Sequence, residues 1–189
     1  MPTAFLCLPL VAQTPRPVQN YAIFVSSDQA PHVKNFGMVE DGVLYRGAQP
    51  DGVGLFELSK FGVKTIVDLR NDRTVERELI VVHSLGMNFV NFPMNGLKAP
   101  TKLQMEQLMF ILETAPKPIF IHCQHGEDRT GTTVAVWRMN HRWSELMAMD
   151  EAKFYHINFV QFAMKNFIKH YQPGKMLEFD EPVRHQMYQ

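Results

Sequence analysis

The sequence predicts an α/β fold in which a central, mostly parallel sheet is flanked by helices on both faces. Short apolar runs rich in β-branched and aromatic residues alternate with longer segments whose apolar residues recur at helical spacing, a pattern typical of parallel sheets. The chain has 189 residues, of which 46% are hydrophobic and 20% charged, so it is long enough for one well-formed core. We see no internal repeat, and we expect a single domain over 31–189 that follows a tail over 1–30.

The first half of the domain is predicted to open with a hairpin. Asp41-Gly42 lies between two apolar runs, and this dipeptide favours a tight turn between strands. Gly62 and Gly86 each follow a segment with helical character, which is typical of helix ends. The elements predicted after the hairpin are a helix over 54–61, a strand over 64–69, a helix over 73–85 and a strand over 87–92.

The second half is predicted to be mainly helical. Thr101 and Gln104 have the spacing of a capping box, so a helix should begin there and continue to Thr114. The later predicted elements are a strand over 118–121, a helix from Arg129, a helix from Ser144 to His156 and a last helix from Asn158 to Tyr171. We expect the apolar residues of the last two helices to pack into the core, and a partner-binding groove is the alternative; these residues are Phe154, Phe159, Phe162, Met164, Phe167 and Ile168.

The most informative motif is the run His122-Cys-Gln-His-Gly-Glu-Asp-Arg-Thr-Gly131. It joins a predicted strand to a predicted helix, and free N–H groups and the helix dipole favour an anion at such a helix start. Cys123 would lie at the base of the loop, where this field favours the nucleophilic thiolate. Arg129 would make a two-pronged contact with phosphoryl oxygens, Gly126 would allow a tight turn, and Thr130 would donate its hydroxyl to the sulfur.

Other types of site fit this motif less well. Zinc would need about four ligands, whereas His122, Cys123 and His125 come from one loop without a second cysteine pair. The run His125-Gly-Glu127 also matches half of a zinc deaminase signature, but the downstream P-C-x-x-C is missing. A nucleotide P-loop would need Gly-x-x-x-x-Gly-Lys, which does not occur. A lone cysteine at a strand end is commonly a buried structural thiol.

The motif matches the signature H-C-x-x-G-x-x-R-[ST]-G of the protein tyrosine phosphatase superfamily. Segments 35–39 and 42–50 resemble the entry strands of compact atypical dual-specificity phosphatases, and 63–70 is similar to the strand that follows in that group. The resemblance covers roughly 33–143 and implies a protein tyrosine phosphatase-like fold. Within the superfamily, the chain resembles small bacterial-type members and the branch that acts on inositol phosphates, including tyrosine-phosphatase-like phytases.

The general acid of this family does not have a counterpart at its usual place. Members usually carry an aspartate roughly 30 residues before the cysteine, and the stretch from Asn88 to His122 contains no aspartate. Asp128, which lies beside Arg129 as in myotubularin-like phosphatases, is our first candidate for protonating the leaving oxygen. Glu127 is the second, and Asp68 is the third. We expect Asp68 rather to orient the cysteine loop or Arg70, and the alternative role for Asp128 is that of a solvated partner of an arginine. A good leaving group would make an acid unnecessary.

Phosphate binding is assigned to the loop and to one lysine outside it. The expected phosphate-binding residues are Gln124, His125, Gly126, Glu127, Gly131 and Lys98. Lys98 comes from the segment that replaces the usual acid loop, and Arg46, Arg70, Arg73 and Lys64 are expected near the same edge. Several cations would suit a highly phosphorylated substrate, whereas phosphotyrosine would need an apolar slot. Each of these cations could equally be a simple surface charge.

These residues predict a metal-independent phosphomonoester hydrolase that works through a cysteinyl-phosphate intermediate and needs no cofactor. We expect inositol polyphosphates as substrates, as for the phytase-like branch. The alternatives are a protein tyrosine or dual-specificity phosphatase that acts on a phosphoprotein, a weakly catalytic phospho-binding module, and a sulfur-transfer enzyme.

The composition bounds the partners and the compartment. Lys plus Arg equals Asp plus Glu at 19 each, which argues against a general nucleic-acid binder, and no apolar run is long enough for a membrane helix. We expect a monomer. Cys7 and Cys123 are too few for a disulfide framework. Residues 4–12 resemble the apolar core of a signal peptide but lack a preceding positive charge, so the expectation is export if this is a signal remnant and a cytoplasmic location otherwise.

Overall fold

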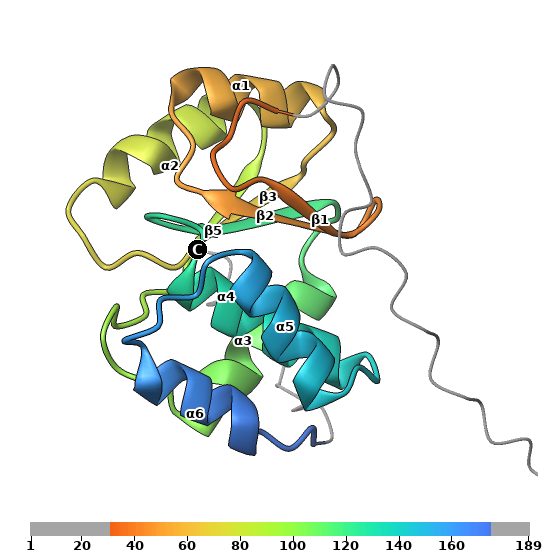
Figure 1. The fold of residues 1–189 in the computed structure, drawn as a ribbon. Coiled ribbons are helices and arrows are strands. Elements are labelled where there is room, and N and C mark those ends of the chain that lie inside the picture. Colours follow the sequence, from red (N-terminus) through yellow and green to blue (C-terminus); the bar gives the residue numbers. More distant parts are fainter. Residues whose placement is uncertain (1–30, 175–189) are drawn as a thin grey trace, which may run out of the picture.

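A computed structural model describes residues 31–174 of the chain. The predicted tail over 1–30, which includes Cys7, lies outside the described residues, as do residues 175–189. The elements in chain order are β1 (Gly37–Glu40), β2 (Leu44–Ala48), α1 (Gly52–Lys60), β3 (Thr65–Asp68), α2 (Val75–Ser84), β4 (Asn88–Asn91), α3 (Lys102–Thr114), β5 (Ile119–Cys123), α4 (Asp128–Asn140), α5 (Glu145–Phe154) and α6 (Phe162–His170) (Figure 1).

The described strands form one sheet in the order β1-β2-β5-β3-β4. Only the β1–β2 pair is antiparallel, which is the predicted hairpin, and the other three pairs are parallel. The predicted α/β class with a mostly parallel sheet is therefore confirmed. β5 is the central strand, and its carboxyl end carries Cys123. This is the edge at which open α/β sheets place their sites.

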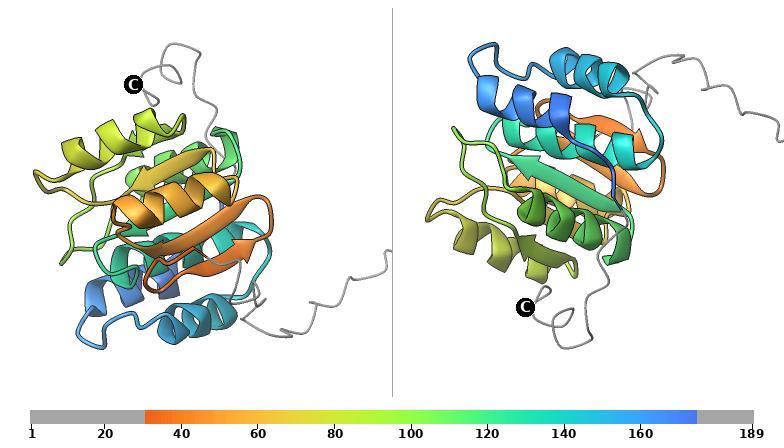
Figure 2. Two further views of the ribbon diagram at one scale, coloured as in Figure 1. Left: turned by 90° about the horizontal axis from the view of Figure 1, so that it is seen from above. Right: turned by 90° about the horizontal axis from the view of Figure 1, so that it is seen from below.

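Helices cover both faces of the sheet. α1 and α2 lie on one face, whereas α3, α4, α5 and α6 lie on the other (Figures 1 and 2). The central strand shows why both faces are apolar: Ile119 and Ile121 belong to the core on the α3–α6 face, and Phe120 between them belongs to the core on the α1–α2 face. Successive side chains of a strand point to opposite faces, so a continuous apolar run is what a doubly covered strand requires.

Side-chain caps define the start of several helices. The capping box before α3 is confirmed, because Gln104 N donates to Thr101 Oγ1 at 3.1 Å and Thr101 N donates to Gln104 Oε1 at 3.0 Å. Ser144 likewise accepts from Met147 N at the start of α5. These bonds satisfy N–H groups that have no partner within the helix, which is why the local sequence predicted both starts well.

The last helix begins later than predicted. α6 starts at Phe162 rather than at Asn158, because the segment before it is committed to other contacts. Asn158 Oδ1 accepts from Val160 N at 3.1 Å, and Gln161 Nε2 donates to the Gly96 carbonyl at 2.8 Å. The segment 158–161 therefore forms a turn that is bonded to a distant loop instead of a helical turn.

The prediction of core packing for the late apolar residues is only partly right. Met164 and Ile168 are fully buried, but the exposed fractions of Phe154, Phe159 and Phe162 are 55%, 79% and 72%. Helical spacing alone does not reveal which of these side chains find a neighbouring element. Within 31–174, none of the helices combines the length and the apolar character that crossing a bilayer would require.

Candidate active site

The predicted catalytic loop connects the central strand to a helix start. Cys123 is the last residue of β5, and α4 begins at Asp128 with Glu127 as its N-cap. Within the described residues, no acceptor is recorded for the backbone N–H groups of His125, Gly126 and Glu127. A loop of unpaired N–H groups at a helix N-terminus is favourable for an anion.

A cavity of about 460 Å³ opens over this loop. It is lined on one side by 123–125 and 127–129 and on the other by 96–97, Asn158 and Gln161. Cys123 is only 3% exposed, so the sulfur lies at the bottom of the cavity rather than on its rim. The predicted phosphate-binding residues Gln124, His125 and Glu127 all contribute to the lining.

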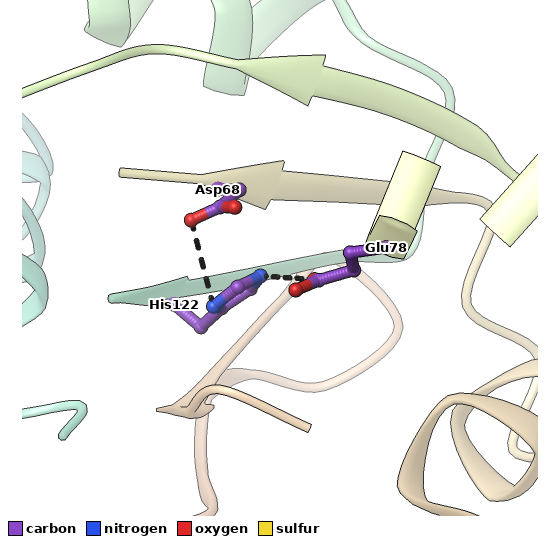
Figure 3. A group of neighbouring side chains, drawn as sticks. All are labelled: Asp68, Glu78 and His122. Atoms are coloured by element: carbon purple, nitrogen blue, oxygen red, sulfur yellow. Dashed lines mark ion pairs between the residues drawn. The ribbon is translucent and has the colours of Figure 1, made fainter. Parts of the chain in front are cut away.

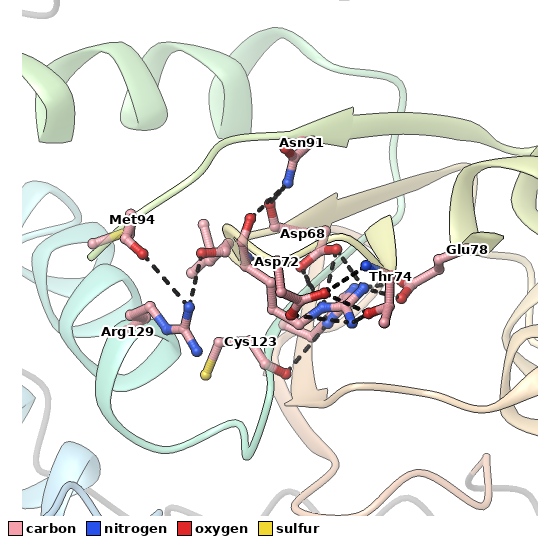
Figure 4. Close-up of polar contacts among 11 residues, drawn as sticks. Asp68, Asp72, Thr74, Glu78, Asn91, Met94, Cys123 and Arg129 are labelled. Atoms are coloured by element: carbon pink, nitrogen blue, oxygen red, sulfur yellow. Dashed lines mark hydrogen bonds and ion pairs between the residues drawn. The ribbon is translucent and has the colours of Figure 1, made fainter. Parts of the chain in front are cut away.

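Arg129 is held beside the cysteine. Its Nη1 lies 3.3 Å from the Leu69 carbonyl and 3.5 Å from the Met94 carbonyl, both of which accept from it. Figure 4 shows the guanidinium and the sulfur of Cys123 turned toward one another. These bonds use one side of the guanidinium and leave the other side available for an oxyanion.

Gly126 is required by both its conformation and its packing. Its φ is +73°, in the region that favours glycine. A Cβ at this position would lie 2.5 Å from the backbone C and O atoms of Gly47, so the loop is pressed directly onto β2. Gly131, by contrast, donates its N–H to the Glu127 carbonyl at 2.7 Å. Its amide is thus engaged in the first turn of α4, which argues against the expected phosphate contact.

Thr130 is buried, and its hydroxyl has no hydrogen-bond partner among the described residues. The expected hydrogen bond to the sulfur of Cys123 is therefore not formed in this structure. The adjacent Thr132 and Thr133 both bond carbonyls one turn earlier in α4, so Thr130 stands apart from its neighbours.

The three acid candidates have different surroundings. Asp128 lines the cavity, and its Oδ1 accepts from Asn158 N at 2.7 Å, which leaves Oδ2 for other partners. Glu127 also lines the cavity. Asp68 is fully buried and is bonded to the Arg70 guanidinium through both carboxylate oxygens. These bonds favour the alternative role of Asp68, which is to orient Arg70.

Asp68 belongs to a buried network beneath the loop. Arg70 Nη2 lies 2.7 Å from Asp68 Oδ2 and 2.6 Å from Glu78 Oε2. His122 Nε2 lies 2.7 Å from Glu78 Oε1, and its Nδ1 lies 3.8 Å from Asp68 Oδ1 and 3.3 Å from the Cys123 carbonyl (Figure 3). The ligand atoms of Asp68, Glu78 and His122 are close enough together to hold a metal ion. However, the Arg70 guanidinium already bonds both carboxylates, so the group fits an ion-pair network better than a metal site.

The expected cluster of cations around the cavity is not formed. Lys98 is exposed, and the cavity is lined by its neighbours Gly96 and Leu97. Arg46 and Arg70 are 0% and 1% exposed and are directed into the protein. In the lining residues, the positive charge of Arg129 is thus accompanied by two carboxylates, Asp128 and Glu127.

Sequence reasoning missed three residues that shape the site. Asn35 donates to the Gly126 carbonyl at 3.1 Å, while Asn158 and Gln161 form the far wall of the cavity. All three contact residues that are far away in sequence, and no local sequence pattern predicts such contacts. The φ of Asn35 is +55°, and this backbone conformation is a property of the folded chain that the sequence alone does not reveal.

Comparison with known proteins places this geometry in a family context. Residues 17–170 match the family model described as DSP-PTPase phosphatase fused to NAD+ kinase. The chain is 31% identical to a probable tyrosine-protein phosphatase of Dictyostelium discoideum over 142 residues. This match covers 71% of the present chain and 84% of the Dictyostelium protein. The chain is 30% identical over 122 residues to an inositol diphosphatase of Arabidopsis thaliana, with coverage of 62% of this chain and 61% of the relative's length.

The fold is also found among solved structures. The catalytic domain of the PP-IP phosphatase SIW14 from Saccharomyces cerevisiae superimposes with a TM-score of 0.67 at 24% identity, covering 82% of this chain and 91% of that one. At this identity the likeness concerns the fold. The expected resemblance to the protein tyrosine phosphatase superfamily is thus confirmed by sequence and by structure.

Proposed function

The chain belongs to the family of DSP-PTPase phosphatases fused to NAD+ kinase, and from this membership we propose that it is a cysteine phosphatase acting on inositol polyphosphates that carry a diphosphate group. The observation that carries the enzymatic part is the placement of Cys123 and Arg129 at the floor of one cavity, around a loop whose N–H groups have no recorded acceptor within the described residues. Such a loop holds the three equatorial oxygens of a transferring phosphoryl group.

In the proposed reaction, the Cys123 thiolate attacks the terminal phosphorus. An S–P bond forms while the P–O bond to the leaving group breaks, and Arg129 and the loop amides balance the charge of the equatorial oxygens. A water molecule then attacks the phosphorus of the cysteinyl phosphate. This second step releases inorganic phosphate and a proton and regenerates the thiolate. It requires neither a metal ion nor a cofactor.

The diphosphate substrate is favoured by the missing acid. An inositol hydroxyl leaves as a strongly basic alkoxide unless it is protonated, whereas the phosphate released from a diphosphate is a weak base and leaves without a proton. The segment from Asn88 to His122 has no aspartate, and Asp68 is committed to Arg70. The name of the Arabidopsis relative, an inositol diphosphatase, points to the same substrate class.

Phosphotyrosine in a peptide is a second candidate substrate. It is favoured by Leu97, which lines the cavity and is 81% exposed, and by Phe159, which follows the lining residue Asn158 in sequence and is 79% exposed. An apolar rim suits an aromatic leaving group better than it suits a ring of phosphates. The name of the Dictyostelium relative agrees with this alternative.

The test is phosphate release from a diphosphoinositol polyphosphate, inositol hexakisphosphate and a phosphotyrosine peptide, side by side, with and without EDTA. We expect the diphosphate to be the best substrate, no effect of EDTA, and complete loss in Cys123→Ser. A mass increase of one phosphoryl group on the Cys123 peptide after rapid quenching would support the intermediate. Preference for the phosphotyrosine peptide would show that the protein is a protein phosphatase instead. Binding of all three compounds without turnover would show that it is a phospho-binding module.

Asp128→Asn sharpens the assignment of the acid. We expect its turnover to fall on inositol hexakisphosphate, whose leaving group needs a proton, and to stay within about two-fold on the diphosphate. Glu127→Gln is the matched control on the neighbouring carboxyl. Equal losses on both substrates in Asp128→Asn would remove Asp128 from the acid role.

A further inference from the structure

β2 carries a buried arginine beside the catalytic strand. Arg46 is 0% exposed, and it lies opposite Ile121 of β5 in the parallel register. A guanidinium without access to water is uncommon, because removing its charge from solvent is unfavourable unless the charge is compensated. The contacts of Arg46 therefore indicate what this position does.

The guanidinium makes one hydrogen bond and one stacking contact. Nη2 donates to the Gly126 carbonyl at 2.6 Å, and Cζ lies 3.9 Å from the centre of the Tyr155 ring. Nε and Nη1 are buried and have no hydrogen-bond partner among the described residues. The single polar contact of this side chain is thus with the catalytic loop.

Within residues 31–174, no carboxylate is hydrogen-bonded to Arg46. The carboxylate that acts most strongly on its charge is Glu151 of α5, but both of its oxygens are bonded to Arg138 at 2.9 Å. Burial lowers the pKa of Arg46 to about 10, while the charges of Glu151, Tyr155 and Cys123 act in the opposite direction. The side chain therefore stays charged at neutral pH. The charge is carried by the strand that pairs with β5, the strand that ends at Cys123.

Asn35 holds the same part of the loop. Its Nδ2 donates to the Gly126 carbonyl at 3.1 Å and lies 3.4 Å from the His125 carbonyl. In a planar trans peptide the N–H points away from the C=O. Drawing these two carbonyls toward β2 therefore turns the N–H groups of Gly126 and Glu127 to the opposite side, and neither N–H has a recorded acceptor in the part of the chain that is described.

We propose that Arg46 is a positioning residue of the catalytic loop, which orients the Gly126–Glu127 peptide toward the bound phosphoryl group and supplies an unpaired positive charge that favours the Cys123 thiolate. Asn35 shares the first task and not the second. The inference rests on the proposed function, in which Cys123 is the nucleophile. It assigns to β2 a part in the chemistry, although the side chain of Arg46 does not reach the cavity.

The test measures two properties that do not depend on substrate turnover. The first is the pH midpoint of Cys123 alkylation by iodoacetamide, followed by mass spectrometry, with the separate Cys7 peptide as internal reference. The second is the affinity for orthovanadate. For Arg46→Met, which removes the charge and the donor, we expect the midpoint to rise by about one pH unit and the vanadate affinity to fall at least ten-fold. Arg73→Met, which removes an exposed arginine, is the control and should change neither.

Two further variants separate the charge from the geometry. Arg46→Lys keeps the charge and is expected to keep the midpoint within about 0.3 pH units of the wild type. Asn35→Ala removes only a neutral donor and is expected to weaken vanadate binding without moving the midpoint. The other ionisable or charged groups around Cys123 and Arg46 stay the same in all variants; they are Arg129, His122, His125, Glu127, Asp128, Asp68, Arg70, Glu151, Arg138 and Tyr155.

An unchanged midpoint and an unchanged vanadate affinity in folded Arg46→Met would overturn the proposal. Should that variant fail to fold, Arg46→Gln takes its place, with the same expected rise in the midpoint and the same criterion for rejection. Failure of the proposed function would look different, because a protein that hydrolyses none of the three substrates would still show these shifts in alkylation and in vanadate binding.

Discussion

Two buried arginines flank the catalytic strand, and their surroundings differ in charge. Arg70, just after β3, is bonded to Asp68, Glu78 and Thr74. Among the described residues, Arg46, within β2, is hydrogen-bonded only to the Gly126 carbonyl, and it stacks on the Tyr155 ring. Both are essentially without exposure to solvent, at 1% and 0%, so burial alone does not distinguish them.

The difference in partners has opposite effects on the two guanidinium groups. Burial disfavours the charge of Arg70, but the hydrogen bonds and charges of Asp68 and Glu78 more than offset it, and the pKa of Arg70 is raised. Burial dominates at Arg46, and its pKa is lowered to about 10. A compensated cation stabilises the fold, whereas an uncompensated one can act on a nearby group, which in our proposal is Cys123.

The largest expected effect is that of removing the compensated cation. Arg70→Met leaves the Asp68 and Glu78 carboxylates buried without their partner, and we expect the free energy of unfolding in urea to fall by about 3–5 kcal/mol. Arg73→Met, at an exposed position of the same loop, should change it by less than about 0.5 kcal/mol. Similar values for the two variants would show that the network around Arg70 does not stabilise the fold.

A smaller effect is expected from one of its carboxylates. Glu78→Gln keeps the shape of the side chain but removes the charge that bonds Arg70 and His122, so we expect a loss of about 1–3 kcal/mol. Glu76→Gln, at an exposed position two residues earlier in α2, is the matched control. The measurement is again unfolding in urea. Equal midpoints for Glu78→Gln and Glu76→Gln would contradict a stabilising role for the buried network.

The smallest change in stability is expected at Arg46. Its lowered pKa corresponds to a burial cost of roughly 3 kcal/mol, and the lost hydrogen bond and ring contact are of similar size. The free energy of unfolding of Arg46→Met in urea should therefore lie within about 1 kcal/mol of the wild-type value. A loss as large as that of Arg70→Met would mean that the two arginines have the same structural role.

The sign of the pH dependence follows from the direction of the shift at Arg46. A base with a lowered pKa is disfavoured in its charged form by folding, so the cost is fully present below about pH 10 and is relieved as the pH rises above that value. Arg46 itself therefore adds no slope to the difference in unfolding free energy between wild type and Arg46→Met between about pH 6 and about pH 9. A slope in this range would come from another group, and the proposed rise in the Cys123 midpoint predicts one around that midpoint.

The elements of the fold could be predicted well from the sequence, because each rests on a local signal. The capping box at Thr101, the hairpin at Asp41-Gly42 and the apolar run of β5 depend on residues within a few positions of one another. The start of α6 was missed because Asn158 and Gln161 bond to Asp128 and Gly96, which are far away in sequence. Local propensity has no access to such partners.

The candidate site divides in the same way. The sequence by itself determined the phosphate loop and its position between a strand and a helix, since the spacing of Cys123, Gly126 and Arg129 belongs to one continuous segment. Only the tertiary structure decided which charges reach the cavity. In the sequence, Arg46 and Arg70 are both arginines in or beside an apolar strand, and nothing local distinguishes them. Their charges differ in compensation because folding brings a carbonyl to Arg46 and two carboxylates to Arg70. The energy of a buried charge depends on these partners, and the partners come from distant parts of the chain.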